Sequence, residues 1–214
     1  MGKATDWTTY YKKKKSFFST HTQKYTERLI LKAIDDYCSS EVRILECGGG
    51  GSCFATSVCQ NDKVTQYDII DNNEFAVGLF NDMELPVKHN GTVWDLTNEG
   101  IGQNTYNFVY SIGLIEHFTD VDREKVIQAH MNCCSPGGIV LISFPTPTKK
   151  YRIIRKLMEM LRVWQFWDET PLTEDRVRPI MERHGCIKEC FINKKLPLTQ
   201  MIIIMEKGKV EADR

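Results

Sequence analysis

The chain of 214 residues is long enough for one domain that buries about 70% of the surface its unfolded form would expose. Lysine plus arginine and aspartate plus glutamate both number 28, so the formal net charge is zero and no chain-wide field favours nucleic acid or an anionic membrane. No apolar run approaches the ~20 residues that cross a bilayer, so we expect no membrane span.

The eight cysteines are expected to be reduced thiols in the cytoplasm, because they show no disulfide-scaffold spacing and no signal peptide is recognised. Cys186 and Cys190 are the only pair spaced for a zinc site, and alternation along a strand explains that spacing as well. We therefore expect no bound metal.

Residues 1–25 are too rich in aromatic side chains for a disordered tail. They could pack on the outer helix layer, with the run Lys12 to Lys15 as a solvated face. The alternative is a lid over a cofactor, with these lysines near an anionic acceptor. Apolar residues at helical spacing then predict a helix over Tyr25 to Tyr37, so 1–39 is expected to form a lid and a helix.

Four consecutive glycines, Gly48 to Gly51, follow a strand predicted over Val42 to Glu46. A strand, a glycine loop and a helix open a nucleotide-type binding unit, because glycine lets a ligand approach the backbone and the helix N–H groups point into the loop. A flexible linker is the alternative, but apolar residues bracket the glycines. A dinucleotide fingerprint fails because Cys53 and Phe54 replace its last glycine, and a P-loop fails because no lysine follows before Lys63.

The remaining pattern, Glu46-x-Gly48-x-Gly50-x-Ser52, resembles the acidic-x-Gly-x-Gly-x-Gly motif of class I S-adenosylmethionine (SAM)-dependent methyltransferases, with serine at the third glycine. The resemblance covers about residues 40–205 and is to small-molecule members (methyltransferase type 11/12-like). It implies an α/β, Rossmann-like doubly wound sheet of seven strands in the order three-two-one-four-five-seven-six, with an antiparallel last strand and helices on both faces. It also implies SAM as the cofactor, bound at these four positions.

The second strand is predicted over Val64 to Ile70, with Asp68 twenty positions beyond Gly48. An acid that ends this strand lies beside the glycine loop and can accept both hydroxyl protons of a ribose. We expect Asp68, with its neighbour Ile69, to contact the cofactor. Asp71 is the alternative if the strand runs longer, and either acid could instead cap the helix predicted over Asn72 to Met83.

The third strand is predicted over Gly91 to Leu96. The resemblance implies that Asp95 accepts from the adenine amino group while Trp94 or Leu96 flanks the ring. An aspartate that only forms the following turn is the alternative.

The fourth strand, Tyr106 to Ile112, is almost continuously apolar, as a strand buried on both faces should be. It leads into the sequence Gly113 to Phe118, which resembles the same place in small-molecule methyltransferases and implies cofactor-side roles for Ser111 and Glu116. Enzymes that methylate adenine or glutamine carry Asn/Asp-Pro-Pro-aromatic there, so nucleic-acid and protein amide acceptors are not expected.

A capping box at Thr119 starts a helix through Met131, and the turn Ser135 to Gly138 precedes a strand over Ile139 to Phe144. An insertion at about 149–170 then holds a helix over Tyr151 to Trp164, whose following aromatic residues are candidates for the wall of the acceptor pocket. A helix over Thr173 to His184 and strands over 186–192 and 199–205 complete the main domain of residues 40–205, leaving 206–214 as a tail.

His117 is the leading candidate for a general base, because a neutral hydroxyl acceptor must lose a proton and histidine titrates near neutral pH. A structural Glu116–His117 pair is the alternative, and His21 and Tyr11 of the lid are rival catalytic residues. The expected activity is methyl transfer to an oxygen (hydroxyl, phosphoryl or carboxylate) of a small-molecule acceptor. We expect this acceptor to be a polar, anionic precursor of a surface glycan or of a secondary metabolite. The alternative is a SAM-binding or inactive protein of this fold that acts through a partner.

Overall fold

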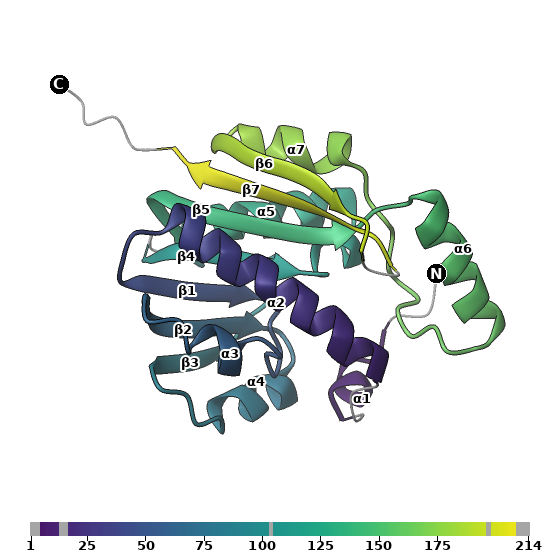
Figure 1. The fold of residues 1–214 in the computed structure, drawn as a ribbon, viewed down its shortest axis with the longest axis horizontal. Helices are drawn as coiled ribbons and strands as arrows, with labels where there is room; N and C mark the ends of the chain where they lie inside the picture. The colour runs from purple at the N-terminus through teal and green to yellow at the C-terminus, as the bar shows by residue number, and fades with distance from the viewer. Residues whose placement is uncertain (1–4, 13–16, 103–104, 196–197, 209–214) are drawn as a thin grey trace.

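The computed structural model describes residues 5–12, 17–102, 105–195 and 198–208, and the side chains of 17–21 lie outside that description. The described ranges contain a seven-stranded sheet in the order β3-β2-β1-β4-β5-β7-β6 (Figure 1). Its strands are β1 (Val42–Cys47), β2 (Val64–Asp71), β3 (Lys88–Val93), β4 (Tyr106–Ile112), β5 (Cys134–Pro145), β6 (Gly185–Asn193) and β7 (Gln200–Lys207). β7 runs antiparallel to both β5 and β6, and the other pairs are parallel, which confirms the predicted topology.

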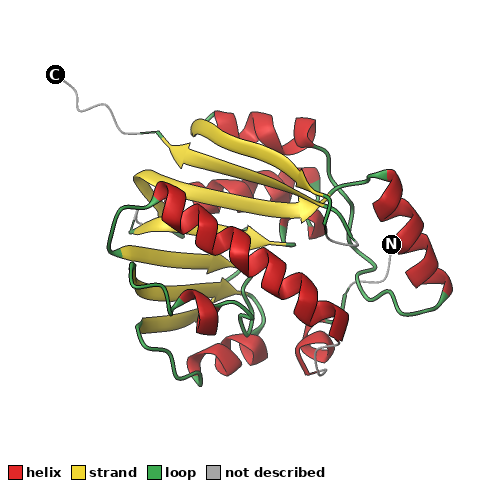
Figure 2. Cartoon of the chain, in the orientation of Figure 1, coloured by secondary structure: helices red, strands yellow, loops and turns green. Residues whose placement is uncertain are grey.

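Helices cover both faces of the sheet (Figure 2). They are α1 (Trp7–Lys12), α2 (Phe17–Tyr37), α3 (Ala55–Val58), α4 (Glu74–Asn81), α5 (Asp120–Cys133), α6 (Lys149–Met160) and α7 (Glu174–Glu182), with a 3-10 turn, η1 (Ile115–His117), after β4. In the described part of the chain, no helix combines the length and the apolar character that crossing a membrane requires.

Each face of the sheet has its own hydrophobic core. Ile30 and Ile34 of α2 pack with Tyr67, Phe108 and Tyr110 on one face. The other face packs buried strand residues against α5 and α7, including Val109, Val140, Ile142, Val126 and Val177. Burying each such side chain contributes about 1.5 to 3 kcal/mol, so the sheet is a firm base for the loops at its carboxyl edge.

Strand boundaries differ from the prediction in β5, which begins at Cys134 and includes the predicted turn Ser135 to Gly138, and at the first edge of the sheet. β2 continues to Asp71, and β3 covers Lys88–Val93 instead of residues 91–96. The polar, half-exposed sequence of β3 is held by its pairing with β2, from Lys88 opposite Gln66 to Val93 opposite Asp71. Hydropathy carries little information about such an edge strand, because long-range pairing determines where it lies.

Candidate active site

The glycine loop joins β1 to α3 at the carboxyl edge of the sheet. Gly48 and Gly50 have φ of 68° and 50°, a conformation that side chains with a Cβ rarely adopt. A Cβ at Gly50 would also collide with the ring of Tyr11 from α1. The loop therefore needs glycine for its backbone and for the close approach of another group.

The side chains of Glu46 and Ser52 lie beneath this loop and form hydrogen bonds with other groups of the protein. The Tyr67 hydroxyl donates to Glu46 Oε2 at 2.7 Å and also contacts the Tyr110 hydroxyl. Ser52 Oγ lies 3.2 Å from the Tyr67 hydroxyl and accepts from the N–H of Ala55 at 3.1 Å. Burial raises the pKa of Glu46 to about 7, although hydrogen bonds from Ser52, Tyr67 and Tyr110 act in the opposite direction. These two predicted cofactor residues thus hold the loop from below.

Asp71, not Asp68, stands at the carboxyl end of β2. Its Oδ2 accepts from the N–H of Gly50 at 2.9 Å, and the Tyr11 hydroxyl lies 3.5 Å from the same oxygen. Burial raises the pKa of Asp71, partly offset by hydrogen bonds from the N–H groups of Asn73 and Gly50.

The sequence-based preference for Asp68 requires the strand to end at Ile70, and the structure shows otherwise. Asp68 lies within the strand opposite Leu45, and its Oδ2 accepts from the Tyr106 hydroxyl at 2.8 Å. Its neighbour Ile69 is fully buried in the hydrophobic core. The acid that touches the glycine loop is therefore Asp71.

Three of the four remaining predicted cofactor positions, all except Glu116, differ in how their side chains are engaged. Asp95 Oδ1 accepts from the N–H of Thr97 at 2.9 Å and from its hydroxyl at 2.7 Å, the geometry of a turn-forming aspartate. Leu96 is buried in the core beside α5. Ser111, near the end of β4, has a fully buried hydroxyl oxygen with no hydrogen-bond partner in the described residues. Such an orphan group is suited to a ligand contact.

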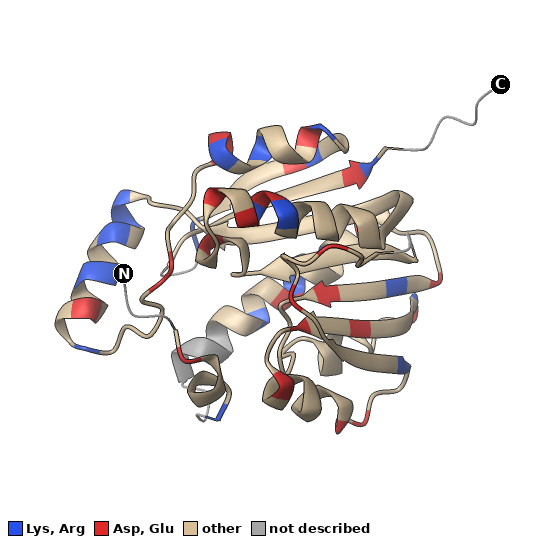
Figure 3. Cartoon of the chain, turned by 180° about the vertical axis from the view of Figure 1, so that it is seen from behind, with Lys and Arg blue, Asp and Glu red and all other residues tan. Residues whose placement is uncertain are grey.

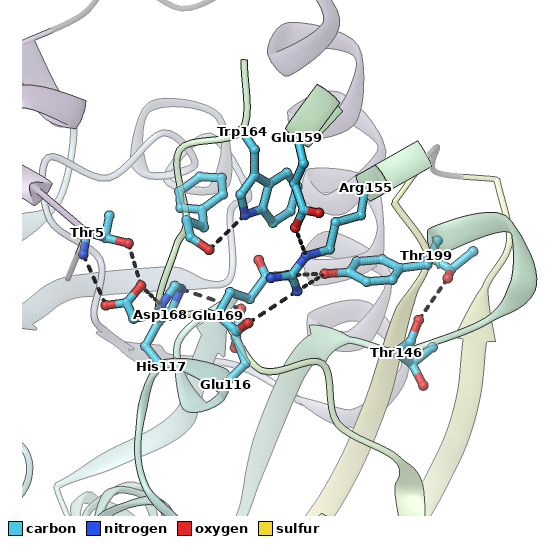
Figure 4. Close-up of polar contacts among 12 residues, drawn as sticks. Thr5, Glu116, His117, Thr146, Arg155, Glu159, Trp164, Asp168, Glu169 and Thr199 are labelled. Atoms are coloured by element: carbon cyan, nitrogen blue, oxygen red, sulfur yellow. Dashed lines mark hydrogen bonds and ion pairs between the residues drawn. The ribbon is translucent and has the colours of Figure 1, made fainter. Parts of the chain in front are cut away.

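His117 lies in η1 and is held by Asp168, which follows α6 (Figure 4). Its Nδ1 is 2.9 Å from Asp168 Oδ1, and Asp168 also accepts from the N–H of Thr5 at 3.3 Å and from the Thr5 hydroxyl. Burial lowers the pKa of His117, although Asp168 opposes this shift. A neutral imidazole that donates from Nδ1 to Asp168 keeps the lone pair of Nε2 available.

Aromatic rings from two distant segments close over this histidine. The ring of Trp7 lies 5.0 Å from that of His117, and the ring of Phe166 lies 6.2 Å from it. The ring centre of Tyr10 lies 5.4 Å from that of Phe166 and 5.5 Å from that of Tyr11. α1 and the segment after α6 thus form one aromatic cover, which places Tyr11 at the glycine loop and Trp7 at His117.

Two further carboxylates lie beside His117. Glu116 is 2% exposed, its Oε1 is 3.9 Å from His117 Nε2, and burial raises its pKa well above the usual value. Glu169 accepts from the Tyr151 hydroxyl and lies 3.6 Å from the guanidinium of Arg155. Glu116, His117 and Glu169 each offer a ligand atom within 4.8 Å of the others and could hold a metal ion. The Arg155 cation already engages Glu169, which disfavours a second cation there.

Sequence reasoning missed Thr5, Asp168 and Glu169, and it named Phe166 only as part of a general aromatic wall. The sequence gives little sign of these residues, because they are far from His117 or from its partners along the chain and come close only when the chain has folded. The predicted catalytic residue His21 has its side chain outside the described residues. Of the run Lys12 to Lys15, the Lys12 ammonium lies 5.1 Å from the centre of the Phe75 ring, and 13–15 lie outside the described residues.

The fold and the site together define a Rossmann-like enzyme in which a glycine loop with a facing acid adjoins a histidine under an aromatic cover. Residues 18–187 match a family model described as a methyltransferase domain, so the chain belongs to this family. It is a SAM-dependent methyltransferase, as the glycine-loop pattern predicts. No curated protein matches the chain.

Solved structures share this fold at low sequence identity. Magnesium protoporphyrin IX methyltransferase from Synechocystis, with bound S-adenosylhomocysteine (SAH), superposes with a TM-score of 0.72 at 13% identity, covering 94% of this chain and 93% of that one. A SAM-dependent methyltransferase from Methanosarcina mazei has a TM-score of 0.65 at 13% identity and covers 83% of this chain and 97% of that one. The cyclase SpnF has a TM-score of 0.65 at 11% identity, covering 86% and 81%.

Proposed function

We propose that the protein transfers the methyl group of SAM to a hydroxyl oxygen of a small-molecule acceptor. The observation that carries this proposal is the Asp168–His117 pair, at 2.9 Å, next to the glycine loop and beneath the aromatic cover. When bound, SAM supplies a methyl group already activated by the sulfonium. The residues of this chain must then align the acceptor, take its proton and exclude water.

The glycine loop and the neighbouring strand ends fit SAM. Gly48 and Gly50 let other groups approach the loop closely, as the Leu114 side chain and the Tyr11 ring do, and Asp71 offers a buried carboxylate that can accept from the ribose hydroxyls. Ser111 brings an unpaired hydroxyl to the same edge of the sheet. We assign the ribose contact to Asp71 and keep the adenine contact at Asp95 and Leu96 as part of the proposal.

His117 is assigned as the general base. His117 Nε2 would take the proton of the acceptor hydroxyl as that oxygen accepts the methyl group, so that the acceptor becomes a neutral ether and His117 an imidazolium. Asp168 holds the tautomer and stabilises the imidazolium that results. Tyr11 is a weaker candidate, because burial, followed by the nearby Asp71, raises its pKa and keeps its hydroxyl protonated.

The charges around His117 favour a neutral hydroxyl over an anionic acceptor. Asp168 lies next to His117 and would repel a phosphate or a carboxylate, whereas burial raises the pKa of Glu116 and of Glu169 and so reduces the negative charge that they contribute. A polyol or phenol, as in a glycan or secondary-metabolite precursor, fits better. This choice narrows the sequence-based expectation, which included anionic acceptors.

α1 is assigned as a lid. Its aromatic residues reach from the glycine loop to His117, so their removal would open both the cofactor side and the acceptor side to water. The Tyr11 hydroxyl also lies where a ribose hydroxyl would approach Asp71, so SAM entry would move or share this contact.

A binding protein without methyl transfer is the second candidate. SpnF has this fold and is a cyclase, so the fold does not determine the reaction. The partly buried His117–Asp168 pair favours proton transfer and therefore an enzyme.

The test begins with mass spectrometry of any small molecule that the purified protein retains. A screen of glycosyl, phenolic and phosphorylated acceptors with methyl-labelled SAM then follows the label and the release of SAH. We expect label on a neutral hydroxyl compound, and transfer at least about a hundredfold slower with His117→Asn. Transfer at the unmodified rate in His117→Asn, or transfer to phosphorylated acceptors alone, would contradict the assignment.

A further inference from the structure

α6 has one face that packs and a second apolar face that does not. The packed face carries Tyr151, Ile154 and Met158, and the Tyr151 hydroxyl donates to Glu169 in the segment that follows the helix. Arg155 lies over the ring of Trp164 at 4.9 Å and closes the same side. The helix stands at one end of the molecule, away from the sheet (Figure 1).

The opposite side of α6 presents large apolar side chains to solvent. Ile153, Leu157 and Met160 follow one another at spacings of four and three residues, so they share one stripe of the helix. They are 69%, 48% and 72% exposed, and Leu161 and Val163 in the next turn are 61% and 50% exposed. We call these five residues the outer apolar stripe. A soluble chain seldom exposes so many large apolar groups together unless they bind something.

Cations border this stripe. Lys149, Arg152, Lys156 and Arg162 are exposed, and none of the four forms an ion pair with a described residue. The acid of the helix, Glu159, is bonded to Arg155 at 2.9 Å and so adds no free negative charge. Figure 3 shows this concentration of basic residues on α6. The formal net charge of the chain is zero, so the positive charge is a local property of this surface.

We propose that the outer apolar stripe and its cations dock on an anionic lipid membrane. An interfacial helix inserts apolar side chains to the level of the acyl boundary, while flanking lysine and arginine pair with anionic headgroups. A lipid surface is favoured over a protein groove because the helix stands at one end of the molecule, away from the sheet (Figure 1), and its exposed apolar residues are interspersed with exposed cations along the chain. Trp167, 47% exposed beyond the helix, adds an aromatic group of the kind found at membrane interfaces.

The same insertion carries residues of the proposed active site. Phe166, Asp168 and Glu169 follow α6 directly, so docking would hold the acceptor side close to the membrane surface. This position suits an acceptor dissolved in the lipid. Membrane binding goes beyond the proposed function and is measured without methyl transfer, so either proposal can fail alone.

The test is co-sedimentation of the full chain with sonicated vesicles, one set of pure phosphatidylcholine and one containing about a third phosphatidylserine. We expect binding to the anionic vesicles at least tenfold tighter than to the neutral ones, and weakened as the salt concentration rises. Ile153→Glu with Leu157→Glu should reduce anionic binding at least tenfold. Arg152→Gln with Lys156→Gln should reduce it several-fold and flatten its salt dependence.

Matched variants separate this surface from a general effect of charge. Val121→Glu changes a side chain on α5 that is also 69% exposed, and Lys24→Gln with Lys88→Gln removes two exposed cations elsewhere. Both should bind vesicles as the unmodified chain does. Absence of binding to anionic vesicles, or equal losses in the control variants, would overturn the proposal. So would a dimer without lipid that dissociates in Ile153→Glu, because the stripe would then be covered by a second copy.

Discussion

The cofactor half and the acceptor half of the site are built in different ways. The centre of the cofactor half comes from one short stretch, in which β1, the glycine loop, α3 and β2 follow one another and Gly50 bonds Asp71 only 21 positions later. The acceptor half joins three distant segments, since Thr5 meets Asp168 across 163 positions and His117 meets Asp168 across 51. A local motif therefore indicates the cofactor, whereas the acceptor site exists only after the chain has folded.

The largest expected effect is in the acceptor half. His117→Asn should lower kcat by about 10²- to 10⁴-fold, the usual contribution of a general base, and leave SAM affinity unchanged. Steady-state kinetics with an acceptor from the screen, together with SAM titration, measures both quantities. His184→Asn, which lies after α7 and outside the site, is the control and should retain full activity. A similar loss of SAM affinity in His117→Asn would show that the two halves are not separate.

The cofactor half should make stability depend on pH through Glu46. Burial raises the pKa of Glu46 from 4.5 to about 7, so the folded protein binds this proton more tightly than the unfolded chain does. Stability is therefore highest below pH 4.5 as far as this group is concerned, and it falls as pH rises to about 7. The loss is about 3 to 4 kcal/mol, from a shift of about 2.5 pKa units at about 1.4 kcal/mol for each unit.

Glu46→Gln isolates that contribution. Urea unfolding at several pH values should show the decline in the unmodified chain and a smaller decline in the variant. Parallel curves would mean that Glu46 has an ordinary pKa in the fold.

The same contrast explains what could be predicted from the sequence. The glycine loop and the cofactor class follow from a local motif, the resemblance that this motif carries implies the strand order, and β4 was predicted with its bounds as found. The choice between Asp68 and Asp71 depended on one residue of strand length, which pairing with β3 decides. Asp168 could not be assigned to His117 because no periodic pattern connects residues so far apart. The helical spacing of Ile153, Leu157 and Leu161 did not indicate that these residues face solvent.

The smallest expected effect is at Thr5, which supports Asp168 from the edge of the lid. Thr5→Val keeps the shape of the side chain and removes one hydrogen bond, worth about 0.5 to 1.5 kcal/mol. We expect kcat to fall by about two- to tenfold with no change in SAM affinity. The midpoint of the pH–rate profile should also shift. This midpoint reports the pKa of His117, and the Asp168 carboxylate that pairs with His117 loses a hydrogen bond in the variant. A loss in SAM affinity with unchanged kcat would place Thr5 in the cofactor half instead.

The central claim is that SAM binds at the glycine loop with its ribose on Asp71. Calorimetric titration of SAM into the unmodified chain, Asp71→Asn and Asp68→Asn tests it most directly. We predict that Asp71→Asn weakens binding by about 1 to 3 kcal/mol, whereas Asp68→Asn binds SAM nearly as well and loses thermal stability instead. Equal affinities for Asp71→Asn and the unmodified chain, or a loss confined to Asp68→Asn, would contradict the account.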